Sequence, residues 1–363
     1  MKEKIIKILE NSPGLTGKQI AQKLGDIKKS ELNSFLYNNS DGLIQVDWKW
    51  YLKEEYVLEL SSNSWVDEET FESDLCNAGC LLSSSSSKCV IRFPEKCSIL
   101  LVAGARLIAL ANQAVRSGKE IVLDFGKCAN TKHYLNRLGF FDHLNHAVSV
   151  LPFRPSKSKA IQYQGNSENL VEIASIDLDC FDYSLPEKLT KRFAHHAGQE
   201  YYQAAFTIFA ELIGNVQEHS ETPIPGFVAL QLYKGKRRHI QTVISDSGLG
   251  IANTLKRNLE RFYPELFNKL DLLSVEGDIY LVSHALTQGG LSQFGSNPDE
   301  AARGLGLRKT QSYAEKYDAI VTVRQPNYEL KLIYKNSKLT GIKEKKELAR
   351  INGTQVCFDF FLN

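Results

Sequence analysis

The segment from Glu211 to His219 constrains this chain most, because it places polar side chains on one face of an otherwise apolar helix. Glu211, Asn215 and His219 follow one another at intervals of four residues, so they share a helix face. Buried polar groups need partners, and a magnesium ion with a bridging phosphate would provide them. The alternative interpretation is an exposed helix face that binds nothing.

Three later segments carry glycines where a ligand can approach the backbone. Residues 244–251 (ISDSGLGI) run from a predicted strand into Asp246, Gly248 and Gly250. A buried aspartate can accept a hydrogen bond from an exocyclic amine, and glycines let the backbone approach a flat base. This segment therefore suits the base of a nucleotide.

The other two segments suit phosphates. Gly304 and Gly306 precede a predicted helix, where free backbone N–H groups can hold phosphate oxygens. Gly353-Thr354 opens the last predicted strand, where a hydroxyl can complete the site. Any one of these motifs is typical of an ordinary turn, whereas all four in this order indicate a nucleotide site.

On these four motifs, residues 195–361 resemble the GHKL ATPases, the family of gyrase, the ninety-kilodalton heat-shock chaperone, sensor histidine kinases and mismatch-repair ATPases. The resemblance implies ATP and Mg²⁺ as cofactors. It implies that Asn215 binds Mg²⁺, that Glu211 polarises the attacking water, that Asp246 reads the adenine amine, that Gly248 and Gly250 shape the base pocket, and that Gly304, Gly306 and Thr354 contact the phosphates.

The resemblance also implies a lid over residues 272–303, which are rich in glycine and polar residues near their end. Arg303 can reach the γ-phosphate from there, and a solvated arginine is the alternative. His219 matches a variable family position and receives only a supporting role.

The ELxxNxxEH pattern is most similar to the anti-sigma-factor serine kinase branch of the family, which acts on small STAS-type partners. The strand at residues 120–125 (EIVLDF) and the helix after it resemble such a STAS domain. Thr131 is the nearest phosphorylation candidate, with a structural helix cap as the alternative. His195-His196 lie where a histidine kinase has its acceptor, but no heptad-patterned hairpin surrounds them.

A chain of 363 residues suggests two or three domains, and its alternating elements predict the α/β class. The C-terminal part predicts a GHKL (Bergerat) α/β sandwich, with helices on one face of a mixed sheet. Its helices are expected near 200–219, 251–259, 278–286 and 304–316, and its strands at 227–233, 239–245, 319–324, 328–334 and 355–361. The expected domains are a winged helix at 1–53, a linker at 54–88, a STAS-like α/β domain at 89–153, a linker at 154–189 and the GHKL domain at 190–363.

The N-terminal segment suggests a contact with double-stranded nucleic acid. Lys29, Asn33 and Tyr37 share one face of its third predicted helix, a combination that suits phosphate-backbone contact. The arrangement resembles winged helices of the Z-DNA-binding type, in which a tryptophan of the wing also touches the backbone. Trp48 or Trp50 would fill that place, and a winged helix used for protein contacts is the alternative.

Composition bounds the remaining possibilities. The net charge of +2 gives no global polyanion-binding signal. No leader-like segment and no apolar run of membrane-spanning length is present, so we expect a cytoplasmic protein with reduced thiols. The cysteines at 76, 80, 89 and 97 lie close together in sequence, but their spacing matches no common zinc pattern, which favours incidental thiols over a metal site.

Three functions stay open at this point. The first is an ATP-hydrolysing switch that couples nucleotide state to a contact of residues 1–53, as a homodimer or with a protein partner. The second is a serine/threonine kinase acting on a STAS-like partner. The third is a non-catalytic nucleic-acid-binding regulator that holds ATP as a structural ligand.

Overall fold

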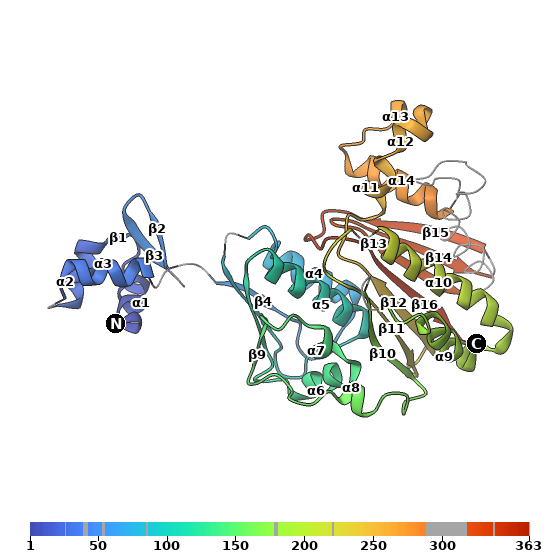
Figure 1. Ribbon diagram of the computed structural model, residues 1–363, viewed down its shortest axis with the longest axis horizontal. Helices are drawn as coiled ribbons and strands as arrows, with labels where there is room; N and C mark the ends of the chain where they lie inside the picture. Colours follow the sequence, from blue (N-terminus) through green and yellow to red (C-terminus); the bar gives the residue numbers. More distant parts are fainter. Residues whose placement is uncertain are drawn as a thin grey trace.

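The computed structural model describes residues 1–25, 27–38, 43–52, 55–84, 86–177, 181–219, 221–287, 318–336 and 338–362. Within these ranges the chain is mixed α/β, with both parallel and antiparallel sheets, so the predicted α/β class is confirmed. Its elements form three groups in chain order (Figure 1).

The N-terminal group has three helices and a three-stranded antiparallel sheet in the order β1-β3-β2. A capping box begins its second helix, since Thr16 Oγ1 accepts a hydrogen bond from Gln19 N and Thr16 N donates to Gln19 Oε1. Leu32, Leu36 and Trp50 lie in its core. The elements are α1 (Lys2–Asn11), β1 (Leu15–Thr16), α2 (Gly17–Leu24), α3 (Lys29–Asn38), β2 (Leu43–Val46) and β3 (Lys49–Leu52).

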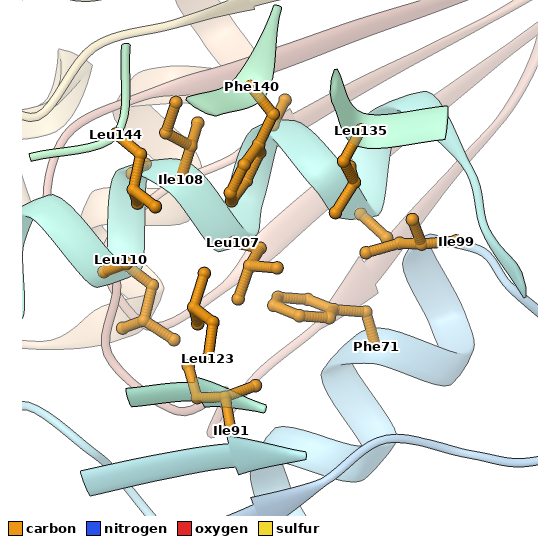
Figure 2. Close-up of a cluster of buried hydrophobic side chains, with 14 of the residues drawn as sticks. Phe71, Ile91, Ile99, Leu107, Ile108, Leu110, Leu123, Leu135, Phe140 and Leu144 are labelled. Carbon is orange, nitrogen blue, oxygen red and sulfur yellow. The ribbon is translucent and has the colours of Figure 1, made fainter. Parts of the chain in front are cut away.

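The middle group is built on a parallel sheet in the order β4-β6-β8-β9. Its helix α5 is buried along almost its whole length, and Figure 2 shows Leu107 of α5 between Phe71 of α4 and the strand residues Ile91 and Leu123. The elements are β4 (Tyr56–Glu59), β5 (Trp65–Val66), α4 (Glu68–Ala78), β6 (Lys88–Arg92), β7 (Ser98–Ile99), α5 (Leu101–Arg116), β8 (Glu120–Asp124), α6 (Ala129–Leu138), α7 (Phe140–His143), β9 (Ser149–Leu151) and α8 (Lys159–Gln162).

Both predicted linkers contain packed elements. Residues 54–88 contribute β4 and α4 to the middle core, where Phe71 and Leu75 are buried. The acidic residues of α4 suggested a linker, but Glu72 is 1% exposed and forms ion pairs inside the protein. Residues 154–189 likewise contain β10 (Leu170–Ile176) and the start of α9 (Leu185–Ala197).

The C-terminal group contains a seven-stranded sheet in the order β10-β11-β12-β16-β13-β14-β15. The five predicted strands are present to within one residue, but all pairings between the described strands are antiparallel, which corrects the expectation of a mixed sheet. Hairpins join β11 to β12, β13 to β14 and β14 to β15, and β16 inserts antiparallel to both β12 and β13. The further elements are η1 (Gln199–Tyr201), α10 (Tyr202–His219), β11 (Gly226–Tyr233), β12 (His239–Ser245), α11 (Ile251–Lys256), α12 (Leu259–Phe262), α13 (Pro264–Lys269), α14 (Val275–Thr287), β13 (Ala319–Arg324), β14 (Glu329–Lys335), β15 (Lys338–Lys345) and β16 (Gln355–Phe361).

Both faces of this sheet are covered, whereas helices were expected on one face only. Along β11, Val228 and Leu230 join the core formed with α9 and α10. Phe227 and Ala229, which alternate with them, join the core of the middle group. The sheet therefore lies between α10 on one side and α5 on the other (Figure 1).

None of the helices in the described ranges combines the length and apolar character needed to cross a bilayer.

Candidate functional site

Asp246 directly follows β12 and is held by two backbone groups. Gly248 N donates to its Oδ1 at 2.7 Å, and Thr354 N donates to its Oδ2 at 3.2 Å. The residue keeps some exposed surface, but desolvation by the surrounding protein raises the pKa of its carboxyl to about 6. The carboxylate is therefore mostly ionised at neutral pH, with acceptor positions beyond those two hydrogen bonds.

The register of β12 and β16 brings two of the predicted motifs together. Ser245 pairs with Gln355, so Asp246 lies beside Thr354, and Asp246 N donates to Thr354 O at 2.9 Å. The resemblance implies a phosphate contact for Thr354, whereas in the structure this residue hydrogen-bonds the aspartate.

Two glycines at this place are required by the backbone. Gly353 has φ of +84°, and an added Cβ would lie 2.2 Å from the carbonyl oxygen of Asp246. Gly250 has φ of +83°, and an added Cβ would lie 2.9 Å from Gln325 Oε1. Both positions therefore need a residue without a side chain, and they allow the two loops to touch.

Gln325 ties the turn between β13 and β14 to the same loops. Its Oε1 accepts a hydrogen bond from Ile251 N at 2.9 Å, and its Nε2 donates to Thr354 Oγ1 at 3.1 Å. The side chain is fully buried. The sequence did not single out Gln325, because one glutamine after a strand carries no local pattern.

The end of α10 lies over the same end of the sheet as Asp246. An added Cβ at Gly226 would lie 2.4 Å from Val216 Cγ1 and 2.9 Å from the carbonyl oxygen of Ser245. Val216 directly follows Asn215, and Ser245 directly precedes Asp246. The predicted helix and the predicted aspartate loop are thus neighbours in space.

Glu211 and Asn215 on α10 are each half-buried. Among the described residues, none forms a hydrogen bond with the Asn215 side chain. The side chain of His219 lies outside the described part of the structure.

Several predicted site residues also lie outside the described residues. They are Arg303, Gly304 and Gly306, together with residues 288–303 of the expected lid and the expected helix at 304–316. The first part of the expected lid contains α14, which confirms the helix expected near 278–286, and its Leu281 and Val282 are fully buried.

A cavity of about 490 Å³ adjoins the glycine loop. Asn215 and Asp246 are not among its described lining residues, so it lies on the α11 side of the loop. Its lining comes mainly from the loop itself, from α11, from the β13–β14 turn and from the segment before β16, and includes Ser247, Gly248, Asn253, Gln325, Tyr328 and Asn352.

The N-terminal candidates have different surroundings. Trp48, at the turn between β2 and β3, is 79% exposed, whereas Trp50 is 3% exposed and belongs to the core. Tyr37 is also exposed, and its hydroxyl donates to Gln45 Oε1 at 3.0 Å. Asn33 is half-buried against the start of α2, so it does not continue the exposed surface of Tyr37. The side chain of Lys29 lies outside the described part of the structure.

Thr131 is neither an exposed acceptor nor the cap of α6. The cap position belongs to Cys128, and Thr131 is 4% exposed with its hydroxyl donating to Cys97 O. The helix-cap alternative is therefore wrong, and the burial of the hydroxyl argues against phosphorylation of Thr131.

Within the described residues, the cysteines at 76, 80, 89 and 97 do not form a group with metal-ligand spacing. The described group that does is Glu68, Cys357 and Asp359. Glu68 is already paired with Lys331 at 2.6 Å, and Asp359 accepts a hydrogen bond from Gln241 at 2.8 Å. Protein contacts thus account for the carboxylates of this group.

No protein-family model matches the chain, and searches of curated proteins and of solved structures gave no match.

Proposed function

We propose that residues 190–363 bind ATP with Mg²⁺, hydrolyse it slowly, and act as a GHKL-type switch that passes its nucleotide state to the N-terminal winged helix. The observation that carries the proposal is the Asp246 carboxylate, which two loops hold at one end of a sheet under the last turns of α10. The STAS-like assignment of the middle group belongs to the same proposal.

The base end of the proposed site is Asp246. An ionised carboxylate that retains free acceptor positions can accept a hydrogen bond from the adenine amine. Thr354 lies against this carboxylate, so we place its hydroxyl at the base end and not at the phosphates. Gly248 and Gly250 have no side chains, so a flat ring can approach the backbone there.

The metal and phosphate end of the proposed site lies at α10. The amide oxygen of Asn215 is a donor that suits Mg²⁺, which prefers oxygen ligands. Glu211 precedes it by about one helical turn and would orient and deprotonate the attacking water. Arg303, Gly304 and Gly306 keep the phosphate contacts that the resemblance implies.

Calorimetric titration with Mg·ATP tests this proposal by comparing variants of two aspartates at the same sheet. We expect Asp246→Asn to bind at least about tenfold more weakly than wild type, because a hydrogen bond to a charged group is lost. Asp359→Asn is the matched control, since burial also raises the pKa of Asp359 to about 6 but this residue pairs with Gln241 at the other end of β12. No binding by wild type, or equal losses in both variants, would contradict the proposal.

ATP labelled on the γ-phosphate distinguishes the reaction types. We expect label to be released as inorganic phosphate, and we expect release to be lost in Glu211→Ala. Turnover by Glu211→Ala equal to wild type would remove the proposed role of Glu211. Label on protein would favour the serine/threonine kinase, and ATP binding without turnover would favour the non-catalytic regulator.

A further inference from the structure

Gln113, near the end of α5, reaches from the middle group into both loops that hold Asp246. Its Nε2 donates to Ser247 Oγ at 2.9 Å and to Asn352 O at 3.0 Å. Its Oε1 accepts a hydrogen bond from Asn352 N at 2.8 Å. The side chain is 4% exposed, so these hydrogen bonds form away from solvent.

The two residues that Gln113 holds are next to the proposed base contacts. Ser247 stands between Asp246 and Gly248, and Asn352 precedes Gly353. One side chain thus fixes the spacing between the loop after β12 and the loop before β16. The Asp246–Thr354 contact joins the same two loops from within the C-terminal group.

A second connection from the middle group reaches the third loop of the site. Arg324, at the end of β13, is bound by Glu72 of α4, and its Nη1 also donates to the carbonyl oxygens of Gln325 and Ile351. Arg106 of α5 binds the same carboxylate at 2.7 Å. Because Gln325 donates to Thr354, the middle group supports all three loops.

We propose that Gln113 is a positioning residue of the nucleotide site, and that the middle group thereby completes a site whose contacts all come from the C-terminal group. This inference rests on the proposed function. Without Gln113, Ser247 and Asn352 lose their common partner, and the two loops keep the Asp246–Thr354 contact but lose the support from the middle group. The adenine amine should then be recognised less well, while the phosphate contacts stay as they are.

The test compares Gln113→Met with Asn112→Leu, two changes that replace a buried amide by an apolar side chain of similar size on adjacent residues of α5. Asn112 is 6% exposed and bonds His143 O and Asn145 N, both inside the middle group. The measurement is the affinity for Mg·ATP relative to that for purine riboside triphosphate, which lacks the amine.

We expect Gln113→Met to lower the ratio of the two affinities about fivefold to tenfold, because the hydrogen bond to the Asp246 carboxylate is weakened and not fully lost. Asn112→Leu should keep the wild-type ratio. A ratio that is unchanged in Gln113→Met, or that falls equally in Asn112→Leu, would overturn the inference. If Gln113→Met does not fold, Ser247→Ala takes its place, with a smaller fall expected.

Amide hydrogen exchange without nucleotide separates this inference from the proposed function. Gln113→Met should exchange at least about tenfold faster than wild type at residues 247–250 and 352–354, and Asn112→Leu should not. Faster exchange in a protein that binds no ATP would refute the proposed function and leave the loop-positioning role intact. Normal exchange in a protein that binds ATP would refute the role of Gln113 alone.

Discussion

Asp246 and Asp359 are two aspartates at the β12–β16 strand pair, and burial raises the pKa of each carboxyl to about 6. Asp359 faces the middle group, accepts a hydrogen bond from Gln241 and lies 3.7 Å from His239. Asp246 instead receives two backbone N–H groups where the strand gives way to a loop. Only the arrangement at Asp246 places a carboxylate beside loop backbone that a ligand can approach.

The raised pKa of Asp246 gives a stability prediction with a definite sign. Because its folded pKa of about 6 exceeds the ordinary aspartate value of 3.8, the folded state favours the protonated form. Above pH 6 the ionised carboxyl lowers the free energy of unfolding, and this loss disappears as the pH falls toward 4 because the carboxyl becomes protonated. When the pH is lowered from 8 to 4.5, we expect the free energy of unfolding of wild type to rise by about 1–2 kcal/mol relative to that of Asp246→Asn.

Urea unfolding at several pH values measures this difference. Asp359 is present in both proteins, so its own titration cancels. A difference that stays constant over this range, or that moves in favour of the variant, would mean that Asp246 is not desolvated.

Gly353 should be sensitive to substitution for two separable reasons. Gly353→Ala combines a positive φ with an approach of 2.2 Å to the Asp246 carbonyl oxygen. Gly118→Ala is the matched control, because Gly118 also has φ of +84° but has no atom of the described residues within 4 Å of an added Cβ. We expect about 1 kcal/mol of destabilisation for Gly118→Ala and about 2–4 kcal/mol for Gly353→Ala in thermal unfolding.

Equal destabilisation by the two alanines would show that the contact between the loops does not form. Gly353→Ala should also weaken Mg·ATP binding, and Gly118→Ala should leave it unchanged.

Residues with a local pattern could be found from the sequence, and residues without one could not. Asp246, Gly248 and Gly250 follow a predicted strand in a recognisable order, and the structure joins them to Thr354. Gln113 and Gln325 carry no such pattern. Gln113 bonds Ser247 and Asn352, and Gln325 bonds Ile251, which are partners 74 to 239 positions away in the chain. Such pairings become visible only in the folded protein.

At the scale of elements, α4 depends on a buried charge cluster. Glu72 binds Arg106 and Arg324, and Arg106 also binds Glu329 at 2.6 Å. The two arginines and Glu72 are at most 1% exposed. Pairing to both arginines lowers the pKa of Glu72 even though burial opposes this, so the carboxyl is held as the charged form.

Glu72→Ala should therefore destabilise the protein strongly, because it leaves Arg324 buried without a carboxylate partner. We expect a loss of about 3–5 kcal/mol in chemical denaturation. Glu69→Ala is the control on the same helix, since Glu69 pairs with Lys331 but is 73% exposed. Its expected loss is below about 1 kcal/mol. A small effect of Glu72→Ala would mean that α4 does not depend on this cluster.

The sequence predicted elements well where apolar residues alternate and poorly where charges are buried. The strands at 227–233 and 355–361 alternate clearly, and both are present. The acidic composition of α4 suggested a linker, because nothing in the sequence indicates that Arg106 and Arg324 neutralise Glu72 inside the fold. For the same reason the sequence did not predict that the second face of the sheet is covered. On that face Glu329 pairs with Arg106 of α5, and Lys331 pairs with Glu68 of α4.

At the scale of the whole molecule, the middle and C-terminal groups share one apolar core. Phe227, Ala229 and Val243 of the sheet lie in the same cluster as the middle helices. We expect residues 55–363 to unfold in a single transition, and an isolated fragment 190–363 to be much less stable because these residues lose their cover. Two separate transitions, or an isolated fragment with the full-length midpoint, would contradict a shared core.

The proposed switch also predicts coupling to the N-terminal group. We expect duplex DNA or RNA to change the ATPase rate about fivefold or more, which is the lower end of the coupling usual between two linked sites. Trp48→Ala should abolish this effect while keeping the basal rate, since its 79% exposed side chain can be removed without disturbing the core. A rate that does not respond to any duplex would favour a protein partner for residues 1–53.

The most direct measurement is a crystal structure of the protein with Mg²⁺ and a non-hydrolysable ATP analogue. It should place the adenine amine about 3 Å from a carboxylate oxygen of Asp246, and the amide oxygen of Asn215 within about 2.1 Å of Mg²⁺. An analogue bound elsewhere, or a crystal saturated with analogue whose Asp246 loop remains empty, would contradict the account.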